Sequence, residues 1–187
     1  MKIFWCLYFL ISISVYANAQ ITDSSVSSTK RYESAYMFIS NPKNLKKADK
    51  LFKKISKKNY PPNVLYELYP ISLMMLSKKA INETIRPDTI AESRIGEFII
   101  QYDRENYFEP VKYFSELEFK GNDKSQLYVV FSKPKDDYLL AELHIDYYNN
   151  KPSNYQSFST IGSYFKILFV FDESGKVKKF FCNKVHQ

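Results

Sequence analysis

The sequence predicts an α+β protein in which two or three N-terminal helices pack on one face of a curved antiparallel sheet of about five strands. Two observations predict this class. Apolar residues recur at helical spacing in the first half of the chain, and after Pro110 they alternate with polar residues, as in strands. Helices that precede strands along the chain are typical of a fold in which the two kinds of element form separate layers.

The first 19 residues have the layout of a secretory signal. A positive start at Lys2 precedes an apolar stretch over residues 3–15, and Ala17 and Ala19 supply the small residues that a signal peptidase reads. The apolar stretch is shorter than the roughly 20 residues that a helix needs to span a bilayer. We therefore expect residues 1–19 to be removed, export to a periplasmic or extracellular compartment, and no transmembrane span in the mature chain.

The rest of the chain is predicted to be one domain behind a short leader. Residues 20–31 are rich in Ser and Thr without apolar periodicity, so we expect a flexible leader. Residues 32–187 have an ordinary length for a single hydrophobic core. After removal of the signal Cys182 is the only thiol, so no intramolecular disulfide is possible. Its neighbours Phe180 and Phe181 favour a buried, inert thiol.

Three helices are predicted before the strands, over about residues 41–59, 64–81 and 88–102. Asn41 is a suitable cap for the first helix, and Pro70 interrupts the second. The third is less sharply defined, because Gly96 weakens a helix and residues 97–102 also fit a strand.

Five strands are predicted, over about residues 111–120, 127–131, 138–148, 164–171 and 177–182. Short turns between them imply an antiparallel meander. Cystatin-like and nuclear-transport-factor-like folds have this order of helices and strands. The similarity is one of architecture only, because no motif in these residues identifies a family, and such folds serve both enzymes and binding proteins.

The residue inventory excludes several kinds of site. Without the signal, two histidines and one cysteine remain, which are too few for a zinc site built from several such ligands, and no acidic cluster has calcium-loop spacing. The four glycines are scattered singly, whereas dinucleotide and phosphate loops need clustered glycines. We therefore expect no metal, no cofactor and no nucleotide.

One candidate catalytic cluster lies on the predicted strand 138–148. Glu142, His144, Asp146 and Tyr148 share one face of it, since alternate side chains point the same way. In a pocket, His144 could act as a general base, with Asp146 or Tyr148 orienting a substrate or donating a proton. Alternate residues lie roughly 6.6 Å apart, which is too far for His144 and Asp146 to bond directly. The alternation itself favours the ordinary solvent face of a half-exposed strand.

A basic surface is predicted on the helix over residues 41–59, which carries eight lysines against one acid. Its members Lys46, Lys50 and Lys54 could contact an acidic protein or an anionic surface, with an attraction that salt screens. The helix lacks arginine, which together with export argues against nucleic acid. The alternative is a set of solvated lysines on an ordinary amphipathic helix.

The polar loop over residues 149–159 is a second candidate binding element. Tyr155 and Phe158 lie in it among asparagines, and such residues make adaptable contacts at little entropic cost. A plain solvated connection is the alternative.

Taken together, the signal, the few catalytic residues and the basic helix lead us to expect an exported, non-catalytic binding or protein-interaction module. The runner-up is a small cofactor-independent enzyme that uses His144 and Asp146 for acid-base chemistry. A peripheral membrane-surface protein is a third hypothesis. The first two differ in which face of the sheet the helices cover, because that decides whether His144 faces a pocket or water.

Overall fold

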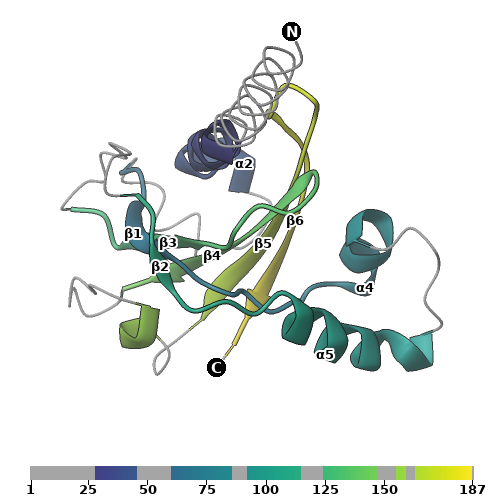
Figure 1. Ribbon diagram of the computed structural model, residues 1–187. Coiled ribbons are helices and arrows are strands. Elements are labelled where there is room, and N and C mark those ends of the chain that lie inside the picture. Colours follow the sequence, from purple (N-terminus) through teal and green to yellow (C-terminus); the bar gives the residue numbers. More distant parts are fainter. Residues whose placement is uncertain are drawn as a thin grey trace, which may run out of the picture.

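The computed structural model describes residues 28–45, 60–85, 92–114, 124–146, 155–158 and 163–186. These residues form an open six-stranded mixed sheet in the order β2-β1-β3-β4-β5-β6, with helices packed against it (Figure 1). The α+β class is therefore confirmed. The sheet has one strand more than expected, and the pairing of its first strands is not purely antiparallel.

The strands are β1 (Asn63–Leu68), β2 (Val111–Lys112), β3 (Leu127–Phe131), β4 (Tyr138–Ile145), β5 (Tyr164–Phe171) and β6 (Val177–Val185). From β3 to β6 they form the expected antiparallel meander, and β3 and β5 have the predicted bounds. The predicted first strand begins at Val111, but it pairs with β1 instead of β3. The strand β1 itself runs parallel to β3.

The helix predicted over residues 64–81 is wrong for its first part, because this part contains β1. Pro62 and Pro70 flank a run of strand length, and such short apolar runs fit either a strand or a helix by periodicity alone. Pairing with β3 decides the outcome. Helical structure appears only at the end of the stretch, in α4 (Lys78–Ala80) and the π-helical turn η1 (Ile81–Ile85).

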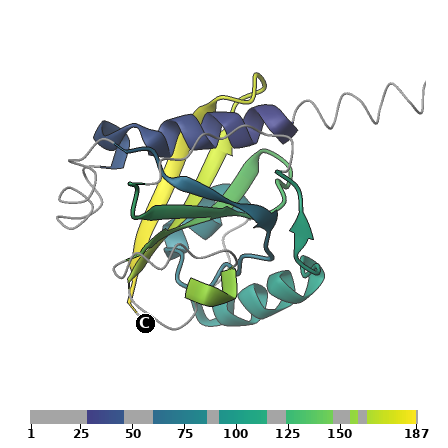
Figure 2. The same ribbon diagram turned by 90° about the vertical axis from the view of Figure 1, so that its left-hand side faces the viewer.

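A helix over residues 28–40 lies across one face of the sheet (Figure 2). The flexible leader predicted over residues 20–31 is therefore wrong for residues 28–31, and residues 20–27 lie outside the described part. The helix forms because four of its apolar residues recur at helical spacing and are buried against the sheet: Tyr32, Ala35, Tyr36 and Ile39. The Tyr32 hydroxyl also donates to the Ser132 carbonyl at 3.0 Å.

The other predicted helices begin close to their expected positions. Asn41 Oδ1 accepts a hydrogen bond from the Lys43 backbone N–H at 3.0 Å, which confirms the cap of α2 (Pro42–Leu45). Residues 46–59 lie outside the described part. The third helix is confirmed as α5 (Ile95–Glu105), preceded by the 3-10 turn η2 (Glu92–Arg94), so the strand alternative for residues 97–102 is wrong.

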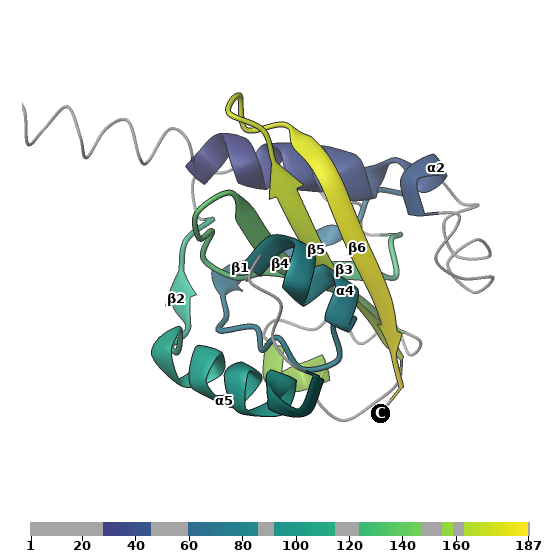
Figure 3. The same ribbon diagram turned by 90° about the vertical axis from the view of Figure 1, so that its right-hand side faces the viewer.

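Helices cover both faces of the sheet, which corrects the prediction that they cover one face. The first face packs under the helix of residues 28–40. The second face packs under α4, η1, α5 and the segment that follows β1, through Leu73, Ile81 and Tyr102 (Figure 3). The 3-10 turn η3 (Tyr155–Phe158) lies on this second face too, through Tyr155. Because both faces are covered, β4 is buried along its whole length.

Candidate functional site

Two residues of the predicted cluster, Glu142 and His144, lie on the second face of β4 beneath the covering layer. Their exposed fractions are 2% and 6%, so the interpretation as a solvent face is wrong. Asp146 follows the strand and is 7% exposed. Tyr148 lies outside the described residues. The face is buried because η3 and the segment after β1 cover it, and neither contact can be read from alternation along one strand.

A buried ion pair joins this cluster to the next strand. The register places Glu142 beside Lys166 of β5, and Lys166 beside Asn183 of β6. Lys166 Nζ lies 3.3 Å from Glu142 Oε1, and both side chains are almost completely buried. Sequence reasoning missed Lys166, although a signal was present: it is the single charged residue of the apolar strand β5.

The second carboxylate oxygen of Glu142 has two partners. His144 Nε2 lies 3.1 Å from Glu142 Oε2, and the Tyr155 hydroxyl donates to the same oxygen at 2.8 Å. Glu142 and His144 are alternate residues of one strand, but the glutamate side chain is long enough to span the gap. Aromatic rings enclose the imidazole, with Tyr164 stacked at 4.9 Å and Tyr155 edge-on at 5.7 Å between ring centroids.

The surroundings of Glu142 change the acidity of the buried groups. Burial raises the pKa of Glu142, but the hydrogen bond from His144, the charge of Lys166 and the hydrogen bond from Tyr155 together outweigh it, so the pKa of Glu142 lies below its ordinary value. Burial first, and then the charge of Glu142, raises the pKa of the Tyr155 hydroxyl far above its ordinary range. Glu142 is therefore an anion and Tyr155 a neutral donor at neutral pH.

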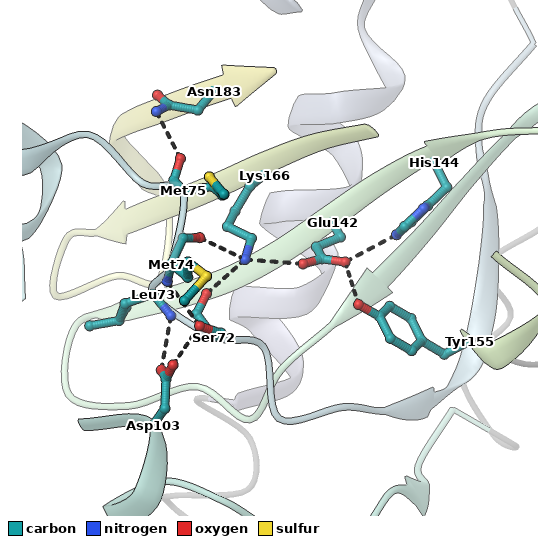
Figure 4. Close-up of polar contacts among 10 residues, drawn as sticks. All are labelled: Ser72, Leu73, Met74, Met75, Asp103, Glu142, His144, Tyr155, Lys166 and Asn183. Atoms are coloured by element: carbon teal, nitrogen blue, oxygen red, sulfur yellow. Dashed lines mark hydrogen bonds and ion pairs between the residues drawn. The ribbon is translucent and has the colours of Figure 1, made fainter. Parts of the chain in front are cut away.

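Lys166 connects the cluster to an exposed loop, which we call the methionine loop (residues 72–76). Its ammonium group donates to the backbone carbonyls of Ser72 and Met74, each at 2.9 Å (Figure 4). Asn183 Nδ2 donates to the Met75 carbonyl at 2.9 Å. Two neighbouring strands thus hold three backbone carbonyl groups of the loop, through side chains that point out of the sheet.

The other side of the methionine loop is held by Asp103 of α5. The Asp103 carboxylate accepts hydrogen bonds from the Ser72 hydroxyl and from the Leu73 backbone N–H (Figure 4). The Ser72 hydroxyl oxygen in turn accepts from the Met74 backbone N–H at 2.9 Å. The loop is therefore fixed from the sheet below and from the helix beside it.

This loop presents two methionines to solvent and contains an unfavourable backbone conformation. Met74 and Met75 are 54% and 56% exposed, whereas Leu73 of the same loop is fully buried. Met75 has φ = 68°, in the left-handed region that residues other than glycine rarely adopt. Such a conformation persists where the surrounding contacts enforce it, and it is found most often at functional sites.

The polar groups of the cluster are engaged in holding structure. A lysine ammonium has three N–H donors, and Lys166 has three acceptors: the carbonyls of Ser72 and Met74 and the carboxylate of Glu142. Both oxygens of that carboxylate are occupied as well. The arrangement is that of a satisfied buried network, which makes a local structure rigid.

Five predicted site residues remain: three lysines of the basic helix and two aromatic residues of the polar loop. Lys46, Lys50 and Lys54 lie outside the described residues. Phe158 ends η3. Tyr155 begins η3, and its hydroxyl is directed inward to Glu142 while its ring packs on Tyr69 at 4.5 Å between centroids. Sequence reasoning missed the methionine loop because it assigned those residues to a helix, and it had no signal for Asp103.

No protein-family model, curated protein sequence or solved structure matches the chain. In the described ranges, no three His, Cys, Asp or Glu side chains group at metal-binding distances. None of the described helices is long and apolar enough to cross a membrane.

The lowered pKa of Glu142 predicts acid sensitivity. A carboxyl whose pKa is lower in the folded than in the unfolded chain stabilises the fold above its unfolded pKa of about 4.3, and this contribution is lost as the pH falls through the lower native pKa. We expect wild type to lose more free energy of unfolding between pH 7 and pH 3 than Glu142→Gln, measured by urea denaturation. Parallel pH profiles of the two proteins would contradict the assignment.

Proposed function

We propose that this chain is an exported, non-catalytic binding protein that recognises an acidic partner protein through the methionine loop. The observation that carries the proposal is the pair of hydrogen bonds from the buried Lys166 ammonium to the carbonyls of Ser72 and Met74. A buried ion pair is a weak source of net stability, but this one fixes the backbone of an exposed loop. A loop that is ordered in advance loses less conformational entropy when a partner binds.

The exposed centre of the proposed surface is apolar and adaptable. Met74 and Met75 each leave more than half of their surface in solvent. Methionine is unbranched and polarizable, so it packs against irregular apolar surfaces and is frequent at binding surfaces. The rigid backbone and the flexible side chains together favour recognition of a partner that supplies apolar contact groups.

The charge around the loop favours an acidic partner. Lys78 and Lys79 of α4 follow the loop and are exposed, while Lys179 of β6 contacts Glu83 of η1. Three lysines against two acids, Glu83 and Asp103, leave this border with a net positive charge, which attracts acidic groups and is screened by salt. The predicted basic face with Lys46, Lys50 and Lys54 remains part of this proposal as a second surface for the same kind of partner.

The acid-base alternative has one observation in its favour. His144 is buried and bonded to the carboxylate of Glu142, and a histidine paired in this way is a common general base. The same carboxylate oxygen also accepts from Tyr155, and aromatic rings enclose the imidazole. We place the enzyme second because these contacts hold structure and because the proposal above accounts for the methionine loop as well.

Charge introduced into the methionine loop is expected to weaken partner binding strongly. We expect the double variant Met74→Glu, Met75→Glu to weaken binding by about thirtyfold or more, since central interface residues contribute about 2 kcal/mol or more each. The purified protein would be immobilised, exposed at low salt to the exported proteins of its own organism, and the captured partner identified and titrated by calorimetry.

Met37 provides a matched control for this experiment. It is 70% exposed and lies on the helix of residues 28–40, on the other side of the sheet, so Met37→Glu is expected to bind as wild type. Equal binding by the loop variant and wild type would refute the proposed surface. A chemical activity that His144→Gln removes without loss of folding stability would replace the proposed function with the enzyme.

A further inference from the structure

A cavity of about 280 Å³ lies between the C-terminal end of α5 and the connection from β3 to β4. Its floor includes Ile71, Tyr102 and Leu140, which are all buried in the apolar core of the second face. Pockets that hold drug-sized ligands have roughly 300–1,000 Å³. The cavity therefore suits a molecule somewhat smaller than these, with an apolar body.

Two lysines stand at the rim of this cavity. Lys133 Nζ lies 4.3 Å from the ring centroid of Phe108, and Lys135 Nζ lies 5.0 Å from that of Tyr102. Lys135 also donates to Asn106 Oδ1 at 2.8 Å. Contacts with aromatic faces are favourable for an ammonium group. These contacts hold the two exposed side chains against the cavity. Lysines on a free surface, by contrast, would sample many rotamers.

The two charged side chains described in the lining of the cavity, Lys133 and Lys135, are both cationic. None of the described residues that line it is Asp or Glu. Within that part, neither Lys133 nor Lys135 has a carboxylate within ion-pair distance. An ammonium group has three N–H donors, and Asn106 takes one of those of Lys135. Donors therefore remain for an anionic group that enters the cavity.

We propose that this cavity binds a compact apolar carboxylate. The apolar body lies on Ile71, Tyr102 and Leu140, and the carboxylate lies between Lys133 and Lys135. An apolar floor combined with a few convergent charged groups is the usual composition of a small-molecule site. This inference does not depend on the proposed function, because none of these residues belongs to the methionine loop.

The test uses two probes with the same body and a different charge, 3-phenylpropionate and 3-phenylpropanol, titrated into the purified protein by NMR. We expect the largest amide shifts at Ile71, Tyr102 and Leu140. The double variant Lys133→Gln, Lys135→Gln is expected to weaken binding of the carboxylate about tenfold at low salt, as the loss of two partly exposed ion pairs implies. Its affinity for the alcohol is expected to stay within about twofold of wild type.

Lys112→Gln with Lys176→Gln is the matched control, because it removes the same charge at two exposed lysines outside the cavity. It is expected to leave carboxylate binding unchanged. Melting curves check that all variants fold.

A peptide that ends in a free phenylalanine carboxylate separates two sources of the ligand. Tighter binding than that of the small probe assigns the site to a chain terminus, and weaker binding assigns it to a free carboxylate. Equal affinity for acid and alcohol, or a carboxylate affinity that the Lys133 and Lys135 changes do not alter, would overturn the proposal.

Discussion

Lys166→Met lowers the free energy of unfolding by about 3–5 kcal/mol, the loss typical of removing one partner of a buried ion pair. The variant leaves the Glu142 carboxylate buried without its cation. It also removes the donor of the Ser72 and Met74 carbonyls. Urea denaturation followed by circular dichroism measures the loss, and the exposed Lys178→Met is the control, with an expected change within about 0.5 kcal/mol.

A second substitution separates the charge effect from the loss of packing. Adding Glu142→Gln to Lys166→Met removes the unpaired charge but keeps a side chain that can bond to His144 and Tyr155. We expect the double variant to recover about 1–3 kcal/mol relative to Lys166→Met, since contacting residues couple by such amounts. If Lys166→Met is as stable as wild type, then the ion pair does not hold the methionine loop, and the main support for the proposed function is lost.

Cys182 of the folded protein is expected to react with thiol reagents about a thousandfold more slowly than the same thiol in the unfolded chain at pH 8. Cys182 packs against the core of the first face, and burial raises the pKa of its thiol from the ordinary 9.0 to about 12. Only the thiolate reacts, so the native rate is expected to keep rising with pH well beyond pH 9. The rate of the unfolded chain levels off near that pH.

The measurement compares the release of a coloured thiolate from a disulfide reagent in buffer and in urea. It uses protein without residues 1–19, in which Cys182 is the only thiol. Similar rates in both conditions would show that the thiol is accessible in the native protein. The expected result agrees with the inert thiol that Phe180 and Phe181 predict from sequence.

Much of the sheet could be predicted from sequence because its signals are local. Alternation and turn residues located β3 and β5 at their observed bounds. The same period of two placed Glu142 and His144 together on one face of β4, as observed. For α5, the helical spacing of Ile95 and Tyr102 was sufficient, since both residues are buried on one side of it.

The errors arose where a long-range contact decided the structure. The run over Asn63–Leu68 became a strand because it pairs with β3, which is distant in sequence. The residues Tyr32, Ala35, Tyr36 and Ile39 carried a helical pattern that the sequence reasoning missed, and it became clear only from their packing on the sheet. Asp103 also acts through a long-range contact. Nothing around it in α5 indicates that it bonds to a loop about thirty residues earlier in the chain.

What the sequence by itself determined is the α+β class, the meander from β3 to β6, the third helix and the shared face of Glu142 and His144. Only the tertiary structure decided that this face is buried, that Lys166 completes the cluster and that its ammonium holds the methionine loop. The physical reason is that periodicity reports which side chains share a face, whereas burial depends on what packs over that face. The covering segments are far away in the chain. The alternation of residues along β4 is therefore the same whether this face contacts solvent or a covering loop.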